Sequence, residues 1–274
     1  MERIDRNNWL ERTEQLIGNE KLDKLKNSHV LVMGLGGVGA YAAEMICRGG
    51  VGKMTIVDGD TVDYNNINRQ LPALHSTIGR AKADVVAERL LDINPELKLS
   101  VIGTYIEDNA MEAMVTQGFD YVVDCIDTLS PKVNLIYSCV KNNIPVVSSM
   151  GAGAKVDPTK ITVVDISKSY NCTLARKLRK SLNKLGVKTG CKVVFSPEEI
   201  IRESVIISLS RNKKSTVGTI SFMPPMFGCY CASVVLNHLT GNANIPNADP
   251  FISNREKRKL EMMESEDDFD PQNN

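Results

Sequence analysis

The sequence HVLVMGLGGVGAYAAEMICR, residues 29–48, predicts a buried strand, a glycine-rich turn and a helix in direct succession. After His29 the next four residues are apolar, as in a strand that is covered on both faces of a parallel sheet. The glycines permit a tight turn and let backbone N–H groups approach a phosphate at the helix N-terminus. Asp58 follows the next apolar run, where a carboxylate can accept ribose hydroxyls. These features predict a nucleotide site, but they do not distinguish NAD, FAD and ATP.

Strand and helix patterns alternate on both sides of this stretch. Short apolar runs at 54–57, 121–123 and 144–147 predict strands, and helical patterns at 81–91 and 132–141 predict helices between them. Such alternation is typical of a doubly wound, Rossmann-like α/β fold with a mostly parallel sheet. Residues 7–27 are rich in charge and predict one or two helices before the first strand.

The second half of the chain predicts a C-terminal α+β extension. Strands are expected at 160–166, 192–195 and 219–223, and helices at 173–185 and from about Pro225. The uncharged stretch 215–240 is interrupted by two prolines, so we expect a buried strand and helix there and no stable membrane insertion. The expected divisions are an N-terminal helical segment (1–27), a nucleotide-binding domain (28–166), a substrate part (167–254) and a charged tail (255–274).

Composition argues against several classes of protein. Lys and Arg total 33, as do Asp and Glu, so the chain as a whole lacks the basic profile of a dedicated nucleic-acid binder. Apolar residues make up 42% of the chain, which is enough for a folded core. The seven cysteines form no CxxC pair and the three histidines are scattered, so a structural zinc site is not expected. The odd cysteine count and the charged opening predict a cytoplasmic protein.

Charged residues near the ends of the predicted strands favour a nucleoside triphosphate over a dinucleotide. Arg69 and Lys82 can neutralise phosphates and stabilise the negative charge that develops when a phosphoryl group is displaced. Asp127, directly after a predicted strand, can hold Mg²⁺ through an oxygen ligand. An NAD-dependent oxidoreductase has no evident need for the two cations, and no hydride-transfer constellation is recognisable.

Together these motifs resemble a known superfamily. The series GLGGVG, D-G-D (58–60), N-x-N-R-Q (66–70), G-x-x-K (79–82) and D-C-x-D (124–127) is similar to that of ubiquitin-activating enzymes and their bacterial relatives in thiamine and molybdopterin synthesis. Two further stretches narrow the resemblance to the bacterial tRNA threonylcarbamoyladenosine dehydratases. These are R-T-E-x-L-I-G at 12–18 and G-A-G-x-x-x-D-P-T at 151–159. Residues 172–176 resemble the C/D-P-L-A-R element of that subgroup, with Thr173 where proline is usual.

The resemblance implies an enzyme that uses ATP and Mg²⁺ to adenylate the carboxylate of threonylcarbamoyladenosine in tRNA, next to the anticodon, and then closes a ring with loss of AMP. The residues that it implies for ATP binding are Gly34, Gly36, Gly37, Gly39, Asp58, Asp60, Asn66, Arg69 and Lys82. It implies Arg69, Lys82, Asp127 and Arg12 for catalysis, with Asp127 also supporting Mg²⁺. Arg12 would reach into the site of a partner subunit, so a homodimer is expected. The competing interpretation of Arg12 is an ordinary salt bridge to Glu11 or Glu14.

A tRNA substrate requires a positive surface, and residues 168–192 contain basic residues without any acid. Leucines at 174, 178, 182 and 185 predict one buried helix face and leave the basic residues turned to solvent. The expected tRNA-binding residues are Lys168, Arg176, Arg179, Lys180 and Lys184, with Arg211, Lys213 and Lys214 as an extension. A basic helix lying on a membrane surface is the rival interpretation.

Three other functions stay open at this point. A ThiF/MoeB-like adenylyltransferase of a sulfur-carrier protein is the main alternative, although its members usually carry paired CxxC motifs. The others are an NAD-dependent oxidoreductase and a non-catalytic tRNA-binding protein with a vestigial nucleotide pocket. A sulfur-transfer or accessory protein is a further candidate partner. Cys172 and Cys191, which flank the basic helix, are the better candidates for thiol chemistry.

Overall fold

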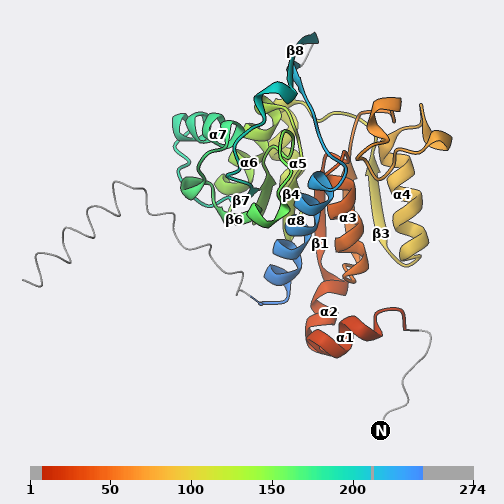
Figure 1. The fold of residues 1–274 in the computed structure, drawn as a ribbon. Helices are drawn as coiled ribbons and strands as arrows, with labels where there is room; N and C mark the ends of the chain where they lie inside the picture. Colours follow the sequence, from red (N-terminus) through yellow and green to blue (C-terminus); the bar gives the residue numbers. More distant parts are fainter. Residues whose placement is uncertain (1–7, 211–212, 243–274) are drawn as a thin grey trace, which may run out of the picture.

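A seven-stranded sheet lies at the centre of the computed structural model (Figure 1). The structure describes residues 8–210 and 213–242, except for the side chains of residue 202 and residues 205–216. The strand order is β3-β2-β1-β4-β5-β7-β6, and every pairing is parallel except that of β6 with β7. The strands are β1 (His29–Met33), β2 (Lys53–Val57), β3 (Lys98–Ile102), β4 (Tyr121–Asp124), β5 (Val146–Ser149), β6 (Thr162–Asp165) and β7 (Lys192–Phe195). A separate antiparallel hairpin consists of β8 (Val205–Ser210) and β9 (Lys213–Val217).

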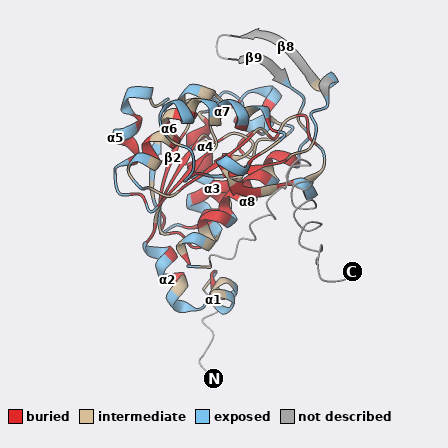
Figure 2. Cartoon of the chain, turned by 90° about the vertical axis from the view of Figure 1, so that its left-hand side faces the viewer, coloured by how far each residue is buried: buried red, intermediate tan, exposed pale blue. Residues whose placement is uncertain are grey.

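Helices cover both faces of the sheet. The covering helices are α3 (Gly39–Arg48), α4 (Lys82–Ile93), α5 (Met111–Val115), α6 (Leu129–Lys141), α7 (Thr173–Lys184) and α8 (Met223–Leu239). Two helices precede β1, α1 (Glu11–Ile17) and α2 (Asn19–Asn27), and α1 buries none of its residues. Because successive side chains of a strand point to opposite faces, Val30 and Val32 of β1 pack with α3, α4 and α8, whereas Leu31 and Met33 pack with α5, α6 and α7. Figure 2 shows the resulting buried layers on the strands and on the inner sides of the helices.

The direction of strand connection reverses beside β1. The chain passes from β1 through α3 to β2 on one side, and it later returns to form β4 on the other side of β1. In open α/β sheets, ligands bind beyond the carboxyl ends of the strands at such a switch point. The glycine-rich turn after β1 and the D-C-x-D stretch at the end of β4 therefore lie at the edge where a ligand is expected.

The predicted doubly wound α/β fold is confirmed, and two details differ. The strand expected at 219–223 is wrong, because residues 218–222 are irregular and α8 begins at Met223. Pro224 and Pro225 occupy the first turn of that helix, where a missing backbone N–H and a fixed φ are well tolerated. The strands β3, β8 and β9 and the short helix α5 were not predicted. None of the described helices is long and apolar enough to cross a membrane.

The second half of the chain contributes to the same sheet as the first. β7 pairs with β5 inside the central sheet, and α8 packs with α3 in one apolar cluster. Residues before and after 166 therefore pack into one structural unit. The predicted division at this residue, between a nucleotide-binding part and a substrate part, stays a prediction. The predicted charged tail, 255–274, lies outside the described residues.

Candidate active site

The glycine loop between β1 and α3 is shaped by close contacts with the end of β4. Gly34 has a positive φ of 88°, and a Cβ added to it would lie 2.9 Å from the carbonyl oxygen of Cys125. A Cβ on Gly39 would overlap the carbonyl oxygen of Gly34. A Cβ on Gly37 would meet Pro224 of α8 at 3.0 Å. Packing within the chain therefore requires these three glycines, whatever ligand the loop binds.

Gly36 differs from the other glycines of the loop. The nearest atom to a Cβ added there is Nε2 of Gln70, at 3.8 Å, so the chain itself leaves this side of the loop open. The Oε1 of Gln70 is buried and accepts no hydrogen bond from the described residues. A buried polar atom without a partner is costly unless a ligand or water satisfies it. The open side of Gly36 and this amide indicate a ligand position above the N-terminus of α3.

Asp58, at the end of β2, is tied to the glycine loop. One carboxylate oxygen accepts the Leu35 N–H at 2.6 Å, and the other accepts the Asp60 N–H at 2.8 Å. Burial raises the pKa of Asp58, whereas these two backbone donors act in the opposite direction. A carboxylate offers about four acceptor positions. The side chain can therefore hold the loop and still accept ribose hydroxyls.

Lys82 is buried at the N-terminus of α4, with 7% of its side chain exposed, and its Nζ donates to an Asp60 oxygen at 2.9 Å. The hydroxyl of Tyr105 donates to the other Asp60 oxygen, and that bond raises the pKa of Tyr105 to about 12. The ring of Tyr105 lies against Gly59, where a Cβ would meet it at 2.8 Å. The sequence did not indicate Tyr105, because it follows a strand that was not predicted.

Arg69 and Asp127 lie near enough at the same edge of the sheet for their charges to interact. The guanidinium of Arg69 donates to the Asn65 carbonyl at 2.9 Å and to Asn68 Oδ1 at 2.7 Å. Burial lowers the pKa of Arg69, and the nearby Asp127 carboxylate acts in the opposite direction. Asp127 itself is exposed, directly after β4. Arg69 and Asp127 thus lie on the same side of the sheet as Asp58, Asp60 and Lys82, and a shared catalytic role for Arg69, Lys82 and Asp127 stays a prediction.

Asn66 has a local structural role that the sequence did not reveal. Its Oδ1 accepts the Asp63 N–H at 3.1 Å, and its Nδ2 donates to Asn65 Oδ1 at 2.7 Å. These bonds cap the 3₁₀ turn Tyr64–Asn66 and order the segment that precedes Arg69. A direct contact of Asn66 with the triphosphate stays a prediction.

Arg12 lies away from the other predicted residues of its own chain. It is exposed on α1, and α2 leads from α1 to the amino end of β1 (Figure 1). The glycine loop is at the opposite, carboxyl end of β1. In the described part of the chain Arg12 forms no salt bridge within 4.0 Å, and Glu11 and Glu14 accept hydrogen bonds from Gln15 and Asn8.

The basic residues predicted to contact tRNA are exposed, except Arg179. Lys168, which precedes α7, is exposed, and so are Arg176, Lys180 and Lys184 of the helix. Arg179 does not face solvent as predicted, because its guanidinium is half-buried and donates to the carbonyls of Ser169 at 2.7 Å and Ile166 at 3.4 Å. Leu178 and Leu182 are buried, but Leu185 is 45% exposed, so the apolar face is shorter than expected. Arg211 and the side chains of Lys213 and Lys214 lie outside the described residues.

The two cysteines that flank α7 are poorly placed for thiol chemistry. Cys172 and Cys191 are both buried free thiols. Burial raises the pKa of Cys191 well above its usual range, so its reactive thiolate is scarce. Neither contributes to the predicted nucleotide site at the carboxyl edge of the sheet.

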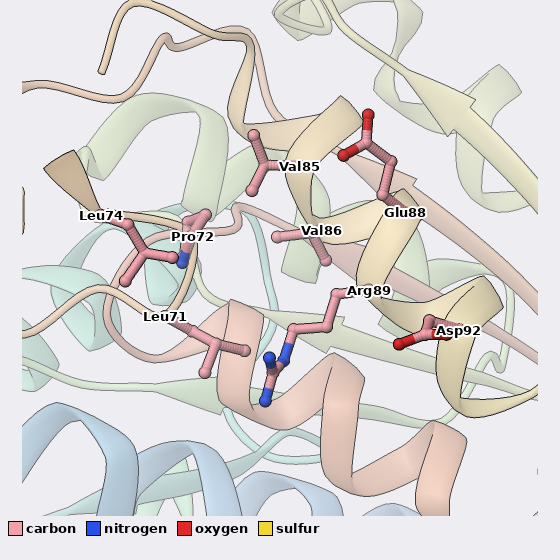
Figure 3. Close-up of a pocket in the computed structure, with 8 residues that line it drawn as sticks. All are labelled: Leu71, Pro72, Leu74, Val85, Val86, Glu88, Arg89 and Asp92. Carbon is pink, nitrogen blue, oxygen red and sulfur yellow. The ribbon is translucent and has the colours of Figure 1, made fainter. Parts of the chain in front are cut away.

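A hollow of about 380 Å³ lies between residues 71–74 and α4 (Figure 3). It is lined by Leu71, Pro72 and Leu74 on one side and by Val85, Val86 and Arg89 of α4 on the other. Arg89 also binds Glu44 of α3. None of the predicted ATP-binding residues lines this pocket.

Known proteins are similar to this chain in both sequence and fold. A model described as the ThiF family matches residues 10–272. A tRNA threonylcarbamoyladenosine dehydratase of Bacillus subtilis is 42% identical over 225 residues, which cover 81% of this chain and 88% of the relative. The crystal structure of the Escherichia coli dehydratase TcdA in complex with ATP has a TM-score of 0.79 and 34% identity, covering 88% of this chain and 98% of that one. The Escherichia coli molybdopterin-synthase adenylyltransferase is 31% identical over 150 residues, only 55% of this chain.

Proposed function

Since this chain belongs to the ThiF family, we propose that it is an ATP-dependent dehydratase of threonylcarbamoyladenosine in tRNA. One observation carries the proposal: similarity to a dehydratase of that name spans 81% of this chain and 88% of the relative. The geometry agrees, because the glycine loop, Arg69 and Lys82 meet at the carboxyl edge of the sheet. The sulfur-carrier alternative is weaker, since its representative matches a smaller part of the chain.

The chemistry follows from the poor reactivity of a carboxylate as an electrophile. The substrate carboxylate attacks the α-phosphate of ATP, pyrophosphate leaves, and an acyl-adenylate forms. The neighbouring carbamoyl group then attacks the activated carbonyl, AMP leaves with one carboxylate oxygen, and a ring closes with net loss of water. Because both reacting ends belong to one side chain, holding them together makes ring closure effectively unimolecular.

Each site residue has a role in this proposal. The open backbone at Gly36 would receive the phosphates, and Arg69 and Lys82 would neutralise them while negative charge develops. In the described residues no three His, Cys, Asp or Glu side chains gather into a metal site. Mg²⁺ bound to a nucleotide commonly takes one or two protein carboxylates and completes its shell with phosphates and water. The exposed carboxylate of Asp127 fits that requirement.

The proposal includes a homodimer in which Arg12 completes the partner's site. The position of Arg12 supports this part of the proposal. Arg12 is exposed on α1, which lies near the amino end of β1, whereas the glycine loop of the same chain follows the carboxyl end of β1. The cytoplasm, where tRNA is modified, is the proposed location. A sulfur-transfer or accessory protein partner stays a prediction from the sequence.

Subunit mixing tests the role of Arg12. Arg12→Ala and Lys82→Ala homodimers should each be inactive, since each lacks one residue at both sites. After co-refolding, mixed dimers should regain activity, because one of their two sites combines the intact Arg12 of one subunit with the intact Lys82 of the other. Dehydration is measured in the separate and mixed samples. Mixed samples as inactive as their components would show that Arg12 does not act across subunits.

The activity itself is tested with purified protein and tRNA that carries threonylcarbamoyladenosine. The digested nucleoside should lose the mass of one water when Mg-ATP is present and keep its mass when ATP is omitted. Mass spectrometry reads both results. A parallel sample holds a sulfur-carrier protein in place of tRNA. Pyrophosphate release that depends on the carrier and not on tRNA would support the alternative function instead.

The basic face of α7 is the proposed tRNA contact. Lys180→Gln/Lys184→Gln should weaken tRNA binding, and the slope of log affinity against log salt should become smaller by about 1 for each lysine removed, as expected for phosphate contacts. ATP affinity should not change, because the helix is separate from the glycine loop. Filter binding across a salt series measures the effect. Lys98→Gln, an exposed lysine of β3, is the control. An unchanged slope in the double variant would remove α7 from the interface.

A further inference from the structure

The end of β4 contains a fully buried ion pair that the mechanism above does not use. Lys132 Nζ lies 2.6 Å from Asp124 Oδ2, and both side chains have 0% exposure. Among the ion pairs of the described residues, this is the only one with both partners fully buried. Lys132 comes from α6, so the pair joins that helix to the sheet.

The Asp124 carboxylate is fixed from three directions. Oδ2 also accepts the hydroxyl of Ser148, on β5, at 2.6 Å, and Oδ1 accepts the backbone N–H of Ile126 at 3.0 Å. With Lys132 on one oxygen and a backbone N–H on the other, the carboxylate cannot rotate without losing hydrogen bonds. A buried pair is weak evidence for stability, because apolar residues of similar volume often stabilise a core as well or better. Stability alone therefore does not explain the pair.

The bond to Ile126 fixes the turn that forms one wall of the active site. That turn, residues 125–127, places the carbonyl of Cys125 against Gly34, where a Cβ would lie 2.9 Å from it. Its last residue is Asp127, whose carboxylate lies near enough to Arg69 for the two charges to interact. A shift of Asp124 would therefore move both the support of the glycine loop and the carboxylate that meets the nucleotide.

We propose that Lys132 is a positioning residue: by holding Asp124, and through it the turn 125–127, it presents Asp127 to Mg-ATP. Lys132 itself touches no reacting group, because it is enclosed between β4, β5 and α6. Ser148 supports the same oxygen of Asp124 and shares the role to a smaller degree. This inference rests on the proposed function, since it assumes that Asp127 serves bound Mg-ATP.

A double-mutant cycle between Lys132 and Asp127 tests the inference by binding rather than by turnover. Lys132→Met should weaken Mg-ATP binding roughly 10- to 100-fold, the usual effect of losing a residue that orients a metal ligand. In an Asp127→Ala background the same change should weaken binding by a clearly smaller factor, because only the support of the glycine loop is then left to lose. Calorimetric titration with ATP, with and without Mg²⁺, gives the four dissociation constants. Equal weakening in both backgrounds would overturn the proposal, and so would unchanged Mg-ATP binding by Asp127→Ala alone.

Two further variants separate positioning from folding. Ser148→Ala removes only one hydrogen bond to Asp124, so it should fold even if Lys132→Met does not. It should weaken Mg-ATP binding more when Asp127 is present than when Asp127 is replaced by alanine. Lys141→Met is the matched control on α6, because that lysine is half-exposed and pairs with Glu112 at 2.9 Å. It should leave binding unchanged. Normal Mg-ATP binding by Ser148→Ala would overturn the proposal. Wild-type protein that binds Mg-ATP but does not dehydrate tRNA would contradict the proposed function. The double-mutant cycle would still test the positioning role of Lys132, because it measures Mg-ATP binding and not dehydration.

Discussion

Lys82→Ala is expected to lower kcat/KM for ATP-dependent dehydration by about 10²- to 10³-fold, the usual effect of removing one group that stabilises transition-state charge. The buried ammonium of Lys82 lies at the N-terminus of α4, next to Asp58 and Asp60. In the proposed reaction, pyrophosphate leaves as negative charge builds on the phosphate oxygens, and this cation is held in place before the reaction begins. Steady-state kinetics with modified tRNA measures the loss.

The loss should come from chemistry and not from unfolding. Asp60, the partner of Lys82, is 49% exposed, so water can solvate its carboxylate once the lysine is removed. Thermal unfolding of Lys82→Ala should therefore resemble that of the wild type. Lys98→Ala removes an exposed lysine from another part of the sheet and should leave both measurements unchanged. Activity of Lys82→Ala within a fewfold of the wild type would contradict the assigned role.

Gly39→Ala is expected to destabilise the protein by about 3 kcal/mol or more, at the upper end of what added atoms cost in a packed interior. The methyl group of the alanine would overlap the carbonyl oxygen of Gly34. The backbone fixes the positions of both atoms, so neither can rotate away. The turn would have to open, and it lies between β1 and the end of β4. Denaturant unfolding followed by circular dichroism measures the change.

Gly36→Ala should give the complementary result. A Cβ there has only the end of the Gln70 side chain near it, at 3.8 Å, so stability should stay close to that of the wild type. ATP binding should nevertheless weaken, because the methyl group occupies the side from which phosphates would approach the backbone. Gly103→Ala, which has no neighbouring atom within 4 Å, controls for the general effect of replacing a glycine. Unchanged ATP affinity in Gly36→Ala would place the phosphates elsewhere.

The fold could be predicted where local pattern and burial agree. β1 is apolar after His29 and the glycine turn that follows it is specific, so the strand, turn and helix at 29–48 were all confirmed. β3 could not be recognised in the same way, because it is an edge strand with mostly exposed residues such as Lys98 and Ser100. The strand expected at 219–223 failed because apolar residues around Pro224 begin a buried helix, and the periodicity of such a short run does not distinguish strand from helix.

Some residues of the site could be predicted from local sequence motifs, whereas others become apparent only in the tertiary structure. Arg69, Lys82 and Asp127 were predicted because each stands in a motif near the end of a strand. Lys132 was not, because a lysine within an amphipathic helix is normally exposed, and only the tertiary fold shows that Asp124 neutralises it. Arg179 was placed on the wrong face for the same reason, since its backbone partners lie outside its own helix.

Isotope tracing of the substrate carboxylate tests the central claim most directly. The tRNA is prepared with oxygen-18 in both carboxylate oxygens of the threonylcarbamoyl group and is converted completely with unlabelled ATP. If the carboxylate attacks the α-phosphate, each AMP released must carry one oxygen-18 atom in its phosphate, and the cyclic nucleoside must keep the other. Mass spectrometry of AMP and of the digested nucleoside reads both positions. Unlabelled AMP, or label found in pyrophosphate or inorganic phosphate, would contradict activation by adenylation.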